Sequence, residues 1–204
     1  MATIGAFLLT SLLIELTPGP NMAYLALVSA VQGRRAGLAA TLGVALGLSI
    51  IGLAAALGLA ALINASETAF ALLRWGGAAY LAWLAIEAWW GAGEVSPERA
   101  ALEEDTAKHF RRGLIVNLLN PKAGLFFVAV LPSFVVSGEN LLGQTVLLTA
   151  LYVAVATVVH LVIVALAGSV NRWFEQPEQQ KIARRIFAVL LAGVALYFLW
   201  STGG

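Results

Sequence analysis

The stretch Glu15-Leu-Thr-Pro-Gly-Pro-Asn21 interrupts an apolar segment that runs from about residue 4 to residue 31. Pro18 and Pro20 lack a backbone N–H and crowd the carbonyl one turn earlier, so they predict a break in a helix. Lipid cannot hydrogen-bond the backbone groups that such a break frees, so the break must face protein or a water-filled cavity. An interrupted helix with polar side chains beside it is typical of carriers that hold a polar solute near the middle of the membrane.

The composition is typical of an integral membrane protein. Of 204 residues, 60% are hydrophobic and only 11% are charged, whereas a soluble domain is about one quarter charged. The net charge of +1 gives no support for a nucleic-acid partner. The absence of cysteine excludes disulfides, thiolate metal sites and thiol redox chemistry. The first apolar segment lacks a basic start and contains Glu15, so we expect a membrane span rather than a signal peptide.

Six segments have roughly the 20 mostly apolar residues that a spanning helix needs. They cover residues 4–31, 37–62, 69–91, 112–136, 144–168 and 184–201. This pattern predicts an all-α integral membrane protein with six transmembrane helices. A polar stretch at 93–111, with charges of both signs, predicts a cytoplasmic linker between a first three-helix repeat (1–92) and a second (112–204).

The two halves have matching breaks. Thr17-Pro18 in the first span has a counterpart in Asn120-Pro121 in the fourth, 103 residues later. Because each half has an odd number of spans, the second half must cross the membrane in the opposite sense. The sequence therefore predicts two inverted three-helix repeats in which helices 1 and 4 are broken, as in many secondary transporters.

Lysine and arginine residues predict the orientation, because they are enriched in cytoplasmic loops. With six spans, the loops after the first, third and fifth spans share one face. Their basic residues are Arg34, Arg35, Arg99, Lys108, Arg111, Arg112, Arg172, Lys181, Arg184 and Arg185. We therefore expect this face in the cytoplasm and both termini in the periplasm.

A stripe of small residues marks the second span. Ala39, Gly43 and Gly47 recur every four residues, which favours close approach of another helix. Packing rather than chemistry is the simplest interpretation of this stripe. If it packs against the first span, it would brace the helix break or let it slide.

Three ionisable side chains are expected deep in the membrane, where such groups are costly and usually functional. Glu15 lies about 16 Å of helix into its span and Lys122 about 15 Å into its own. His160 has a similar depth in the fifth span, and histidine is suited to proton transfer near neutral pH. Glu87 lies about a turn from the inner end of the third span, so we expect it to reach the interface.

The helix breaks add partial charges to these side chains. Half-helices that start at Pro20 and Pro121 present positive ends that suit a carboxylate, and Lys122 adds to that charge. Free carbonyls before each break, with Glu15, suit an ammonium group. The sequence therefore predicts a site for a zwitterion. The expected substrate-binding residues are Thr17, Pro18, Gly19, Pro20, Asn21, Asn117, Asn120, Pro121 and Lys122, and the expected proton-coupling residues are Glu15 and His160.

Simpler roles for these residues stay open at this point. A proline kink in a membrane helix is often only structural. Lys122 could snorkel to the interface, or it could neutralise Glu15 as a buried pair without a ligand. His160 could be an ordinary interhelical hydrogen-bonding residue.

Several motifs resemble those of the lysine and homoserine–threonine exporter family, the LysE/RhtB type. They are Leu16-Thr-Pro-Gly-Pro-Asn21, Gly76-Gly-Ala-Ala-Tyr-Leu81, Asn117-Leu-Leu-Asn-Pro-Lys-Ala123, Phe126-Phe127 and Leu131-Pro-Ser-Phe134. The resemblance extends over the whole chain. It implies an efflux carrier of the bacterial inner membrane for amino acids or related metabolites, driven by the proton gradient.

We therefore expect a secondary exporter of a small zwitterionic solute, and not an enzyme. Its expected partners are an amino-acid substrate, a proton as the coupling ion and membrane lipid, without a cofactor or resident metal. A metal or cation exporter is the first alternative, although such a protein would require clustered carboxylates or soft ligands. An intramembrane enzyme is a weaker one, and no GxxxxGK[ST] motif supports ATP-driven transport. The sequence leaves open whether the carrier is a monomer or a homodimer.

Overall fold

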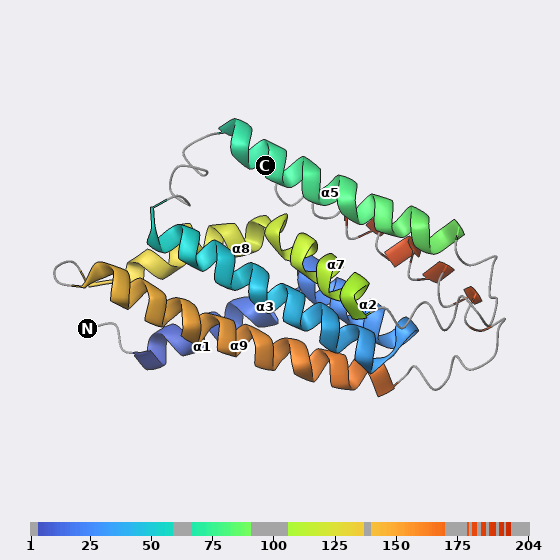
Figure 1. Cartoon of the computed structure of the whole chain (residues 1–204), viewed down its shortest axis with the longest axis horizontal. Coiled ribbons are helices and arrows are strands. Elements are labelled where there is room, and N and C mark those ends of the chain that lie inside the picture. The colour runs from blue at the N-terminus through green and yellow to red at the C-terminus, as the bar shows by residue number, and fades with distance from the viewer. Residues whose placement is uncertain are drawn as a thin grey trace.

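The computed structural model is built from helices of very different lengths (Figure 1). It describes residues 4–58, 67–90, 106–136 and 140–169, together with 179, 181–182, 185–186, 188–190, 192–193 and 195–196. The elements are α1 (Ile4–Leu16), α2 (Pro20–Gln32), α3 (Arg34–Ala56), α5 (Glu67–Trp90), α7 (Thr106–Leu118), α8 (Pro121–Leu125), the π-helix η2 (Phe126–Val130), the 3-10 helix η3 (Leu131–Phe134) and α9 (Leu141–Ser169).

The distribution of side chains is that of a membrane protein. Large apolar side chains such as Leu42 on α3 and Leu166 on α9 are exposed, while Asn117 and His160 are buried. Among the described residues, two helices, α3 and α9, are long and apolar enough to cross a membrane, and the bent pair of residues 106–118 and 121–134 counts as a third if it forms one span. The six predicted spans therefore stay a prediction. Half of the residues of the predicted sixth span at 184–201, and the linker up to residue 105, lie outside the described residues.

The chain breaks its helices at both predicted positions. Between α1 and α2, Gly19 is extended, with φ −161° and ψ 176°, and Pro20 begins α2. Between α7 and α8, Asn120 caps the new helix by accepting a hydrogen bond from the backbone N–H of Lys122 at 3.0 Å, and Pro121 follows at the first position. Proline suits this first position because the N–H it lacks has no partner inside the helix. The bend across the second break is 52°.

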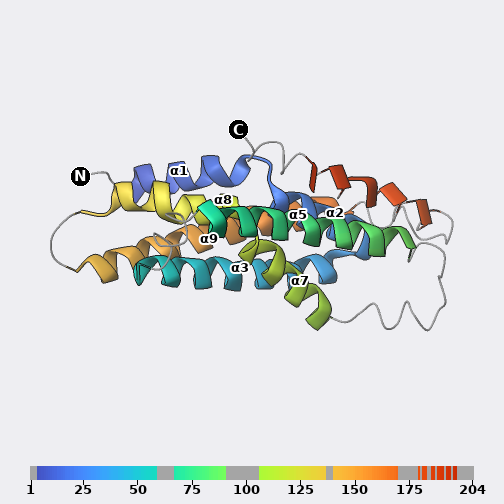
Figure 2. The ribbon, with the colours of Figure 1, turned by 90° about the horizontal axis from the view of Figure 1, so that it is seen from above.

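Successive helices reverse direction along the molecule (Figure 2). The pair α1 and α2 runs in one direction, and α3 runs in the opposite direction. The helix α5 is parallel to α1 and α2, whereas the pair α7 and α8 is antiparallel to them. The junction of α2 with α3, the end of α5, the start of α7 and the end of α9 lie at one end of the molecule. We call this the basic end, because it carries Arg34, Arg35, Lys108, Arg111, Arg112 and Arg185.

The small-residue stripe of α3 packs against α7. A Cβ at Gly43 would lie 2.0 Å from the Phe110 carbonyl oxygen, and one at Gly113 would lie 2.1 Å from the Ala40 carbonyl oxygen. The two backbones therefore touch. Gly47 faces the Asn117 side chain in the same way. The stripe thus packs against the second broken helix at these positions, and the condition for bracing the first is not met there, because α7 occupies that face of α3.

Glu87, which the sequence predicts at the membrane interface, is paired with basic residues of α7, and its depth in the membrane stays a prediction. Its carboxylate is only partly exposed, and it accepts a hydrogen bond from the Arg112 guanidinium of α7. Lys108 Nζ lies 3.4 Å from the other carboxylate oxygen. The side chain points across to a neighbouring helix because two cations there compensate its charge.

Candidate functional site

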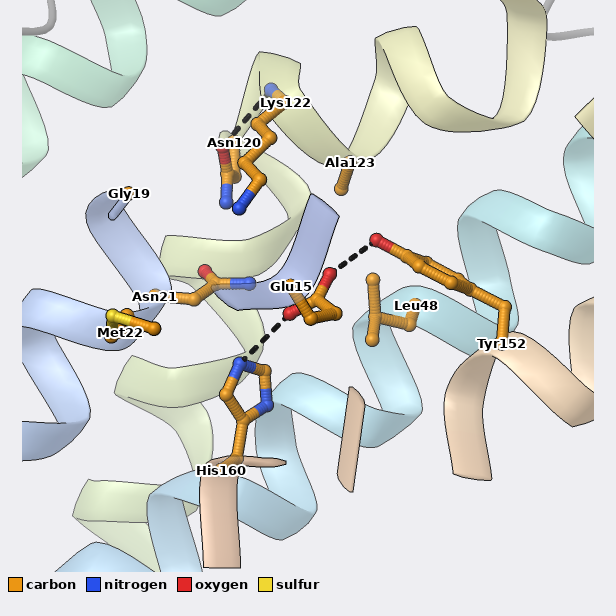
Figure 3. Close-up of a pocket in the computed structure, with 10 residues that line it drawn as sticks. All are labelled: Glu15, Gly19, Asn21, Met22, Leu48, Asn120, Lys122, Ala123, Tyr152 and His160. Atoms are coloured by element: carbon orange, nitrogen blue, oxygen red, sulfur yellow. Dashed lines mark hydrogen bonds and ion pairs between the residues drawn. The ribbon is translucent and has the colours of Figure 1, made fainter. Parts of the chain in front are cut away.

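Glu15 is the centre of a buried polar cluster on the last full turn of α1. Its side chain is 7% exposed, and both carboxylate oxygens have partners on α9 (Figure 3). The Tyr152 hydroxyl donates to Oε1, and His160 Nε2 lies 3.3 Å from Oε2. A buried carboxylate needs such partners, because leaving it unpaired away from water costs several kcal/mol.

Aromatic packing holds Tyr152 in place for this contact. Its ring stacks on Phe126 with 3.6 Å between the centroids and meets the edge of Phe127 at 5.4 Å. Phe126 and Phe127 begin the π-helical turn after the second break, and π-helical turns are frequent at functional sites. The second broken helix therefore orients the tyrosine that hydrogen-bonds the carboxylate of the first.

Lys122 joins the two breaks directly. Its ammonium donates to the carbonyl oxygen of Thr17 at 2.6 Å, where α1 has just ended. Carbonyls at a helix C-terminus have no partner inside the helix and carry partial negative charge, so a cation is stabilised there. Lys122 therefore does not snorkel to an interface, and it is not in direct contact with Glu15, whose oxygens are bound to α9.

Two asparagines form a second bridge between the broken helices. Asn21 Nδ2 donates to Asn117 Oδ1 at 2.7 Å. The remaining amide atoms, Asn21 Oδ1 and Asn117 Nδ2, are buried without a protein partner. Unsatisfied buried polar groups are rare in folded proteins and call for a water, ion or ligand.

A small cavity lies between these groups. It is lined by Glu15, Gly19, Asn21, Met22, Leu48, Asn120, Lys122, Ala123, Tyr152 and His160 (Figure 3). Its volume is about 10 Å³, which is about the room that one water molecule needs. An amino acid cannot fit unless the surrounding helices part.

The predicted site residues fall into two groups in the structure. The cavity is lined by Glu15, Gly19, Asn21, Asn120, Lys122 and His160. Outside its lining lie Thr17, Pro18, Pro20, Asn117 and Pro121. In this second group, Thr17 and Pro18 are exposed, and Thr17 Oγ1 bonds back to the Leu13 carbonyl oxygen. Thr17 contributes its backbone oxygen, and Asn117 contributes through Asn21.

Sequence reasoning missed Tyr152, together with the lining residues Met22, Leu48 and Ala123. A signal for Tyr152 exists, because it is a hydroxyl-bearing aromatic residue two helical turns before His160 in an otherwise apolar run. Met22, Leu48 and Ala123 carry no such signal, since an apolar residue in a membrane helix is ordinary. Among the described residues, no group of three or more histidines and carboxylates is placed to hold a metal ion.

The comparisons with known proteins identify a family and several relatives. The family model of the LysE type translocator matches residues 12–202. The homoserine/homoserine lactone efflux protein of Salmonella typhimurium is 34% identical over 91% of this chain and 90% of its own. The leucine efflux protein of Enterobacter sp. is 27% identical over 94% of this chain and 90% of its own. An uncharacterized membrane protein of Vibrio cholerae is 29% identical over 94% of this chain and 93% of its own. No solved structure matches.

These matches place the chain among bacterial membrane transport proteins and not among enzymes. The chain belongs to the LysE type translocator family, and the resemblance that its motifs indicated is confirmed.

Proposed function

We propose that this protein is a secondary exporter of amino acids in the bacterial cytoplasmic membrane, where it exchanges a zwitterionic amino acid for a proton. The observation that carries the proposal is the placement of Glu15 and Lys122 around one cavity at two helix breaks. A neutral or hydroxylated amino acid fits this pair of charges, and the names of the relatives support a substrate of that kind.

The two charged ends of a zwitterion have different partners in this site. The N-terminus of α2 at Gly19 has no side-chain cap, whereas Asn120 already caps α8. The substrate carboxylate therefore binds at the start of α2, where free N–H groups attract anions. The substrate ammonium binds the Glu15 carboxylate.

Lys122 changes partner during this cycle. Without substrate its ammonium neutralises the Thr17 carbonyl end of α1. Gly19 adjoins it, since a Cβ there would lie 3.7 Å from Nζ. A substrate carboxylate at the start of α2 draws Lys122 away from Thr17, because a full negative charge attracts the ammonium more strongly than a carbonyl does.

Glu15 couples substrate to proton. As a carboxylate it holds the substrate ammonium, and once protonated it cannot. A proton that arrives from the periplasm therefore releases the amino acid outward and leaves toward the cytoplasm in the next half-cycle. Tyr152 and His160 stabilise the carboxylate between these events, and His160 is the nearest group that can accept its proton.

The proposed repeat organisation makes this exchange possible. Residues 1–92 and 112–204 form two inverted three-helix repeats joined by 93–111, with both termini in the periplasm and the basic end in the cytoplasm. Support comes from the opposite directions of the two broken helices (Figure 2). The small cavity corresponds to an occluded arrangement, and rocking of one repeat against the other opens it to either side.

Transport in proteoliposomes tests the proposal. Purified protein is reconstituted into vesicles, and a proton gradient is imposed that drives protons from outside to inside. The movement of labelled homoserine, leucine, threonine and lysine is then followed. We expect counter-transport of at least one neutral amino acid that stops when the gradient is collapsed, and its absence in Lys122→Ala. A wild-type protein that moves none of these solutes, or a Lys122→Ala variant that transports normally, contradicts the proposal.

A further inference from the structure

A second charged cluster lies between α5 and α7, away from the central cavity. The Arg112 guanidinium donates to Glu87, and Lys108 lies 3.4 Å from the same carboxylate. The Arg112 side chain is only 15% exposed. A cation buried to this degree is costly without a carboxylate partner. The pair therefore holds two opposite charges in fixed positions, with the Glu87 side chain 37% exposed.

Aromatic residues surround this pair. The Arg112 guanidinium lies 5.8 Å from the centre of the Trp83 ring, and the Tyr80 ring lies 5.5 Å from that of Trp83. Tyr24 of α2 is 1% exposed, and its hydroxyl has no protein partner. The helix that carries Tyr24, α2, packs against α7, which carries Arg112.

Along α2 and α7, the cluster lies between the basic end and the central cavity. Tyr24 follows Asn21 by three residues on α2, and Arg112 precedes Asn117 by five residues on α7. These separations correspond to about 4.5 Å and about 7.5 Å of helix. The Asn21–Asn117 pair, with its two unpartnered amide atoms, therefore lies next to the cluster on the cavity side.

We propose that Glu87, Arg112 and Tyr24 form a second binding site for the zwitterionic amino acid, which it occupies on its way from the cytoplasm to the central cavity. The inference rests on the proposed function, since it takes the amino acid as the solute. Between the two sites, the unpartnered amide atoms of Asn21 and Asn117 supply hydrogen bonds to the moving substrate.

The cluster has one partner for each charged end of a zwitterion. The planar guanidinium of Arg112 can bind the substrate carboxylate through two parallel hydrogen bonds. The Glu87 carboxylate, released from Arg112, binds the ammonium, and the Tyr24 hydroxyl gains the partner it lacks. Because the protein already holds both charges in place, binding exchanges one ion pair for two and adds no uncompensated charge.

Protection of a single cysteine tests this site, and the chain offers a clean background because it has no native cysteine. Tyr80→Cys, beside the cluster, is reacted with a charged methanethiosulfonate in inverted membrane vesicles, with and without homoserine or leucine. The substitution Lys122→Ala is included in the background so that amino-acid binding in the central cavity is impaired. Trp90→Cys, on an exposed residue at the basic end of the same helix, is the matched control for reagent access.

We expect the amino acid to slow labelling at Tyr80→Cys about ten-fold at a concentration ten times its Kd, because the rate falls with the free fraction. Labelling at Trp90→Cys stays unchanged. Glu87→Gln removes the protection, whereas Lys108→Gln, which also alters a charge of the cluster, retains it. A cooperative thermal unfolding transition of Glu87→Gln in detergent, at a temperature close to that of the wild type, shows that this variant is folded.

The inference is overturned if wild-type protein transports the amino acid while Tyr80→Cys is not protected, or if Glu87→Gln leaves the protection intact. Neither result affects the central site. Failure of the proposed function appears separately, as a wild-type protein that moves no amino acid in proteoliposomes.

Discussion

Lys122 and Thr17 lie 105 positions apart in the chain, yet the ammonium of one donates to the backbone carbonyl of the other at 2.6 Å. The contact closes the end of α1 with a side chain from the first turn after the break between α7 and α8. A carbonyl freed by one helix break is thus neutralised by a cation that the other break positions.

Replacement of Lys122 by methionine removes this hydrogen bond and the charge that the proposal assigns to the substrate carboxylate. A hydrogen bond to a charged group contributes about 1.5–3 kcal/mol, so we expect about ten- to hundred-fold weaker amino-acid binding in detergent. Lys181→Met removes the same charge outside the cavity lining and serves as the control. Equal affinities in both variants would remove Lys122 from the site.

Substitution of Glu15 by glutamine keeps the size of the side chain and removes its titration. We expect amino-acid efflux to fall strongly and the residual efflux to lose its response to an imposed pH gradient, because the neutral side chain neither holds the substrate ammonium nor exchanges it for a proton. The measurement is initial efflux from proteoliposomes at several pH gradients, beside wild-type protein. A Glu15→Gln variant that still follows the gradient assigns coupling to another group.

Tyr152→Phe removes only the hydroxyl that donates to Glu15 and keeps the ring stacked on Phe126. We expect about 1–3 kcal/mol lower stability, since one buried carboxylate oxygen loses its donor, and slower proton-driven efflux. Thr145→Val on the same helix removes a hydroxyl that bonds only within α9 and should leave efflux unchanged. Thermal unfolding in detergent and efflux rates measure the two effects, and a normal rate in Tyr152→Phe contradicts its role.

The hydrogen bond between Asn21 and Asn117 is suited to a double-mutant cycle. We expect Asn21→Leu and Asn117→Leu to destabilise the protein by less together than the sum of their separate effects, because each leaves the other amide unpaired. Groups in direct contact typically show a coupling of about 0.5–3 kcal/mol. Additive effects on the unfolding free energy would mean that the broken helices do not interact through these amides.

Gly43 tests the contact between α3 and α7. A Cβ there would lie 2.0 Å from a backbone carbonyl that cannot rotate away, so Gly43→Ala forces the helices apart. We expect a loss of about 1–3 kcal/mol or more, the usual cost of overpacking. Gly124→Ala is the control, since nothing lies within 4 Å of a Cβ at that helical glycine. Thermal unfolding of both variants in the same detergent decides the comparison.

Short-range features of the chain were predictable because proline chemistry acts within a few residues. Pro20 and Pro121 each begin a new helix where the sequence predicts a break. Glu15 and His160 are both buried in the protein, and their predicted depth in the membrane, which rests on the apolar residues around them, stays a prediction. The membrane class and the family followed from composition and motifs.

Long-range pairing was less predictable. Neither the bond from Tyr152 to Glu15, across 137 positions, nor the packing of Gly43 on α7 has a signal in local periodicity. The expected ammonium site at the end of α1 is occupied by the protein's own Lys122, because the arrangement of two helices decides which cation is nearer.

The sequence by itself determined where the helices break and which charged residues lie in an apolar environment, since these depend on neighbouring residues and on the cost of burying charge. Only the tertiary structure decided which groups meet at the breaks. Pairs such as Lys122 with Thr17 depend on how helices distant in the sequence pack, and that is set by close contacts such as Gly43 with Phe110.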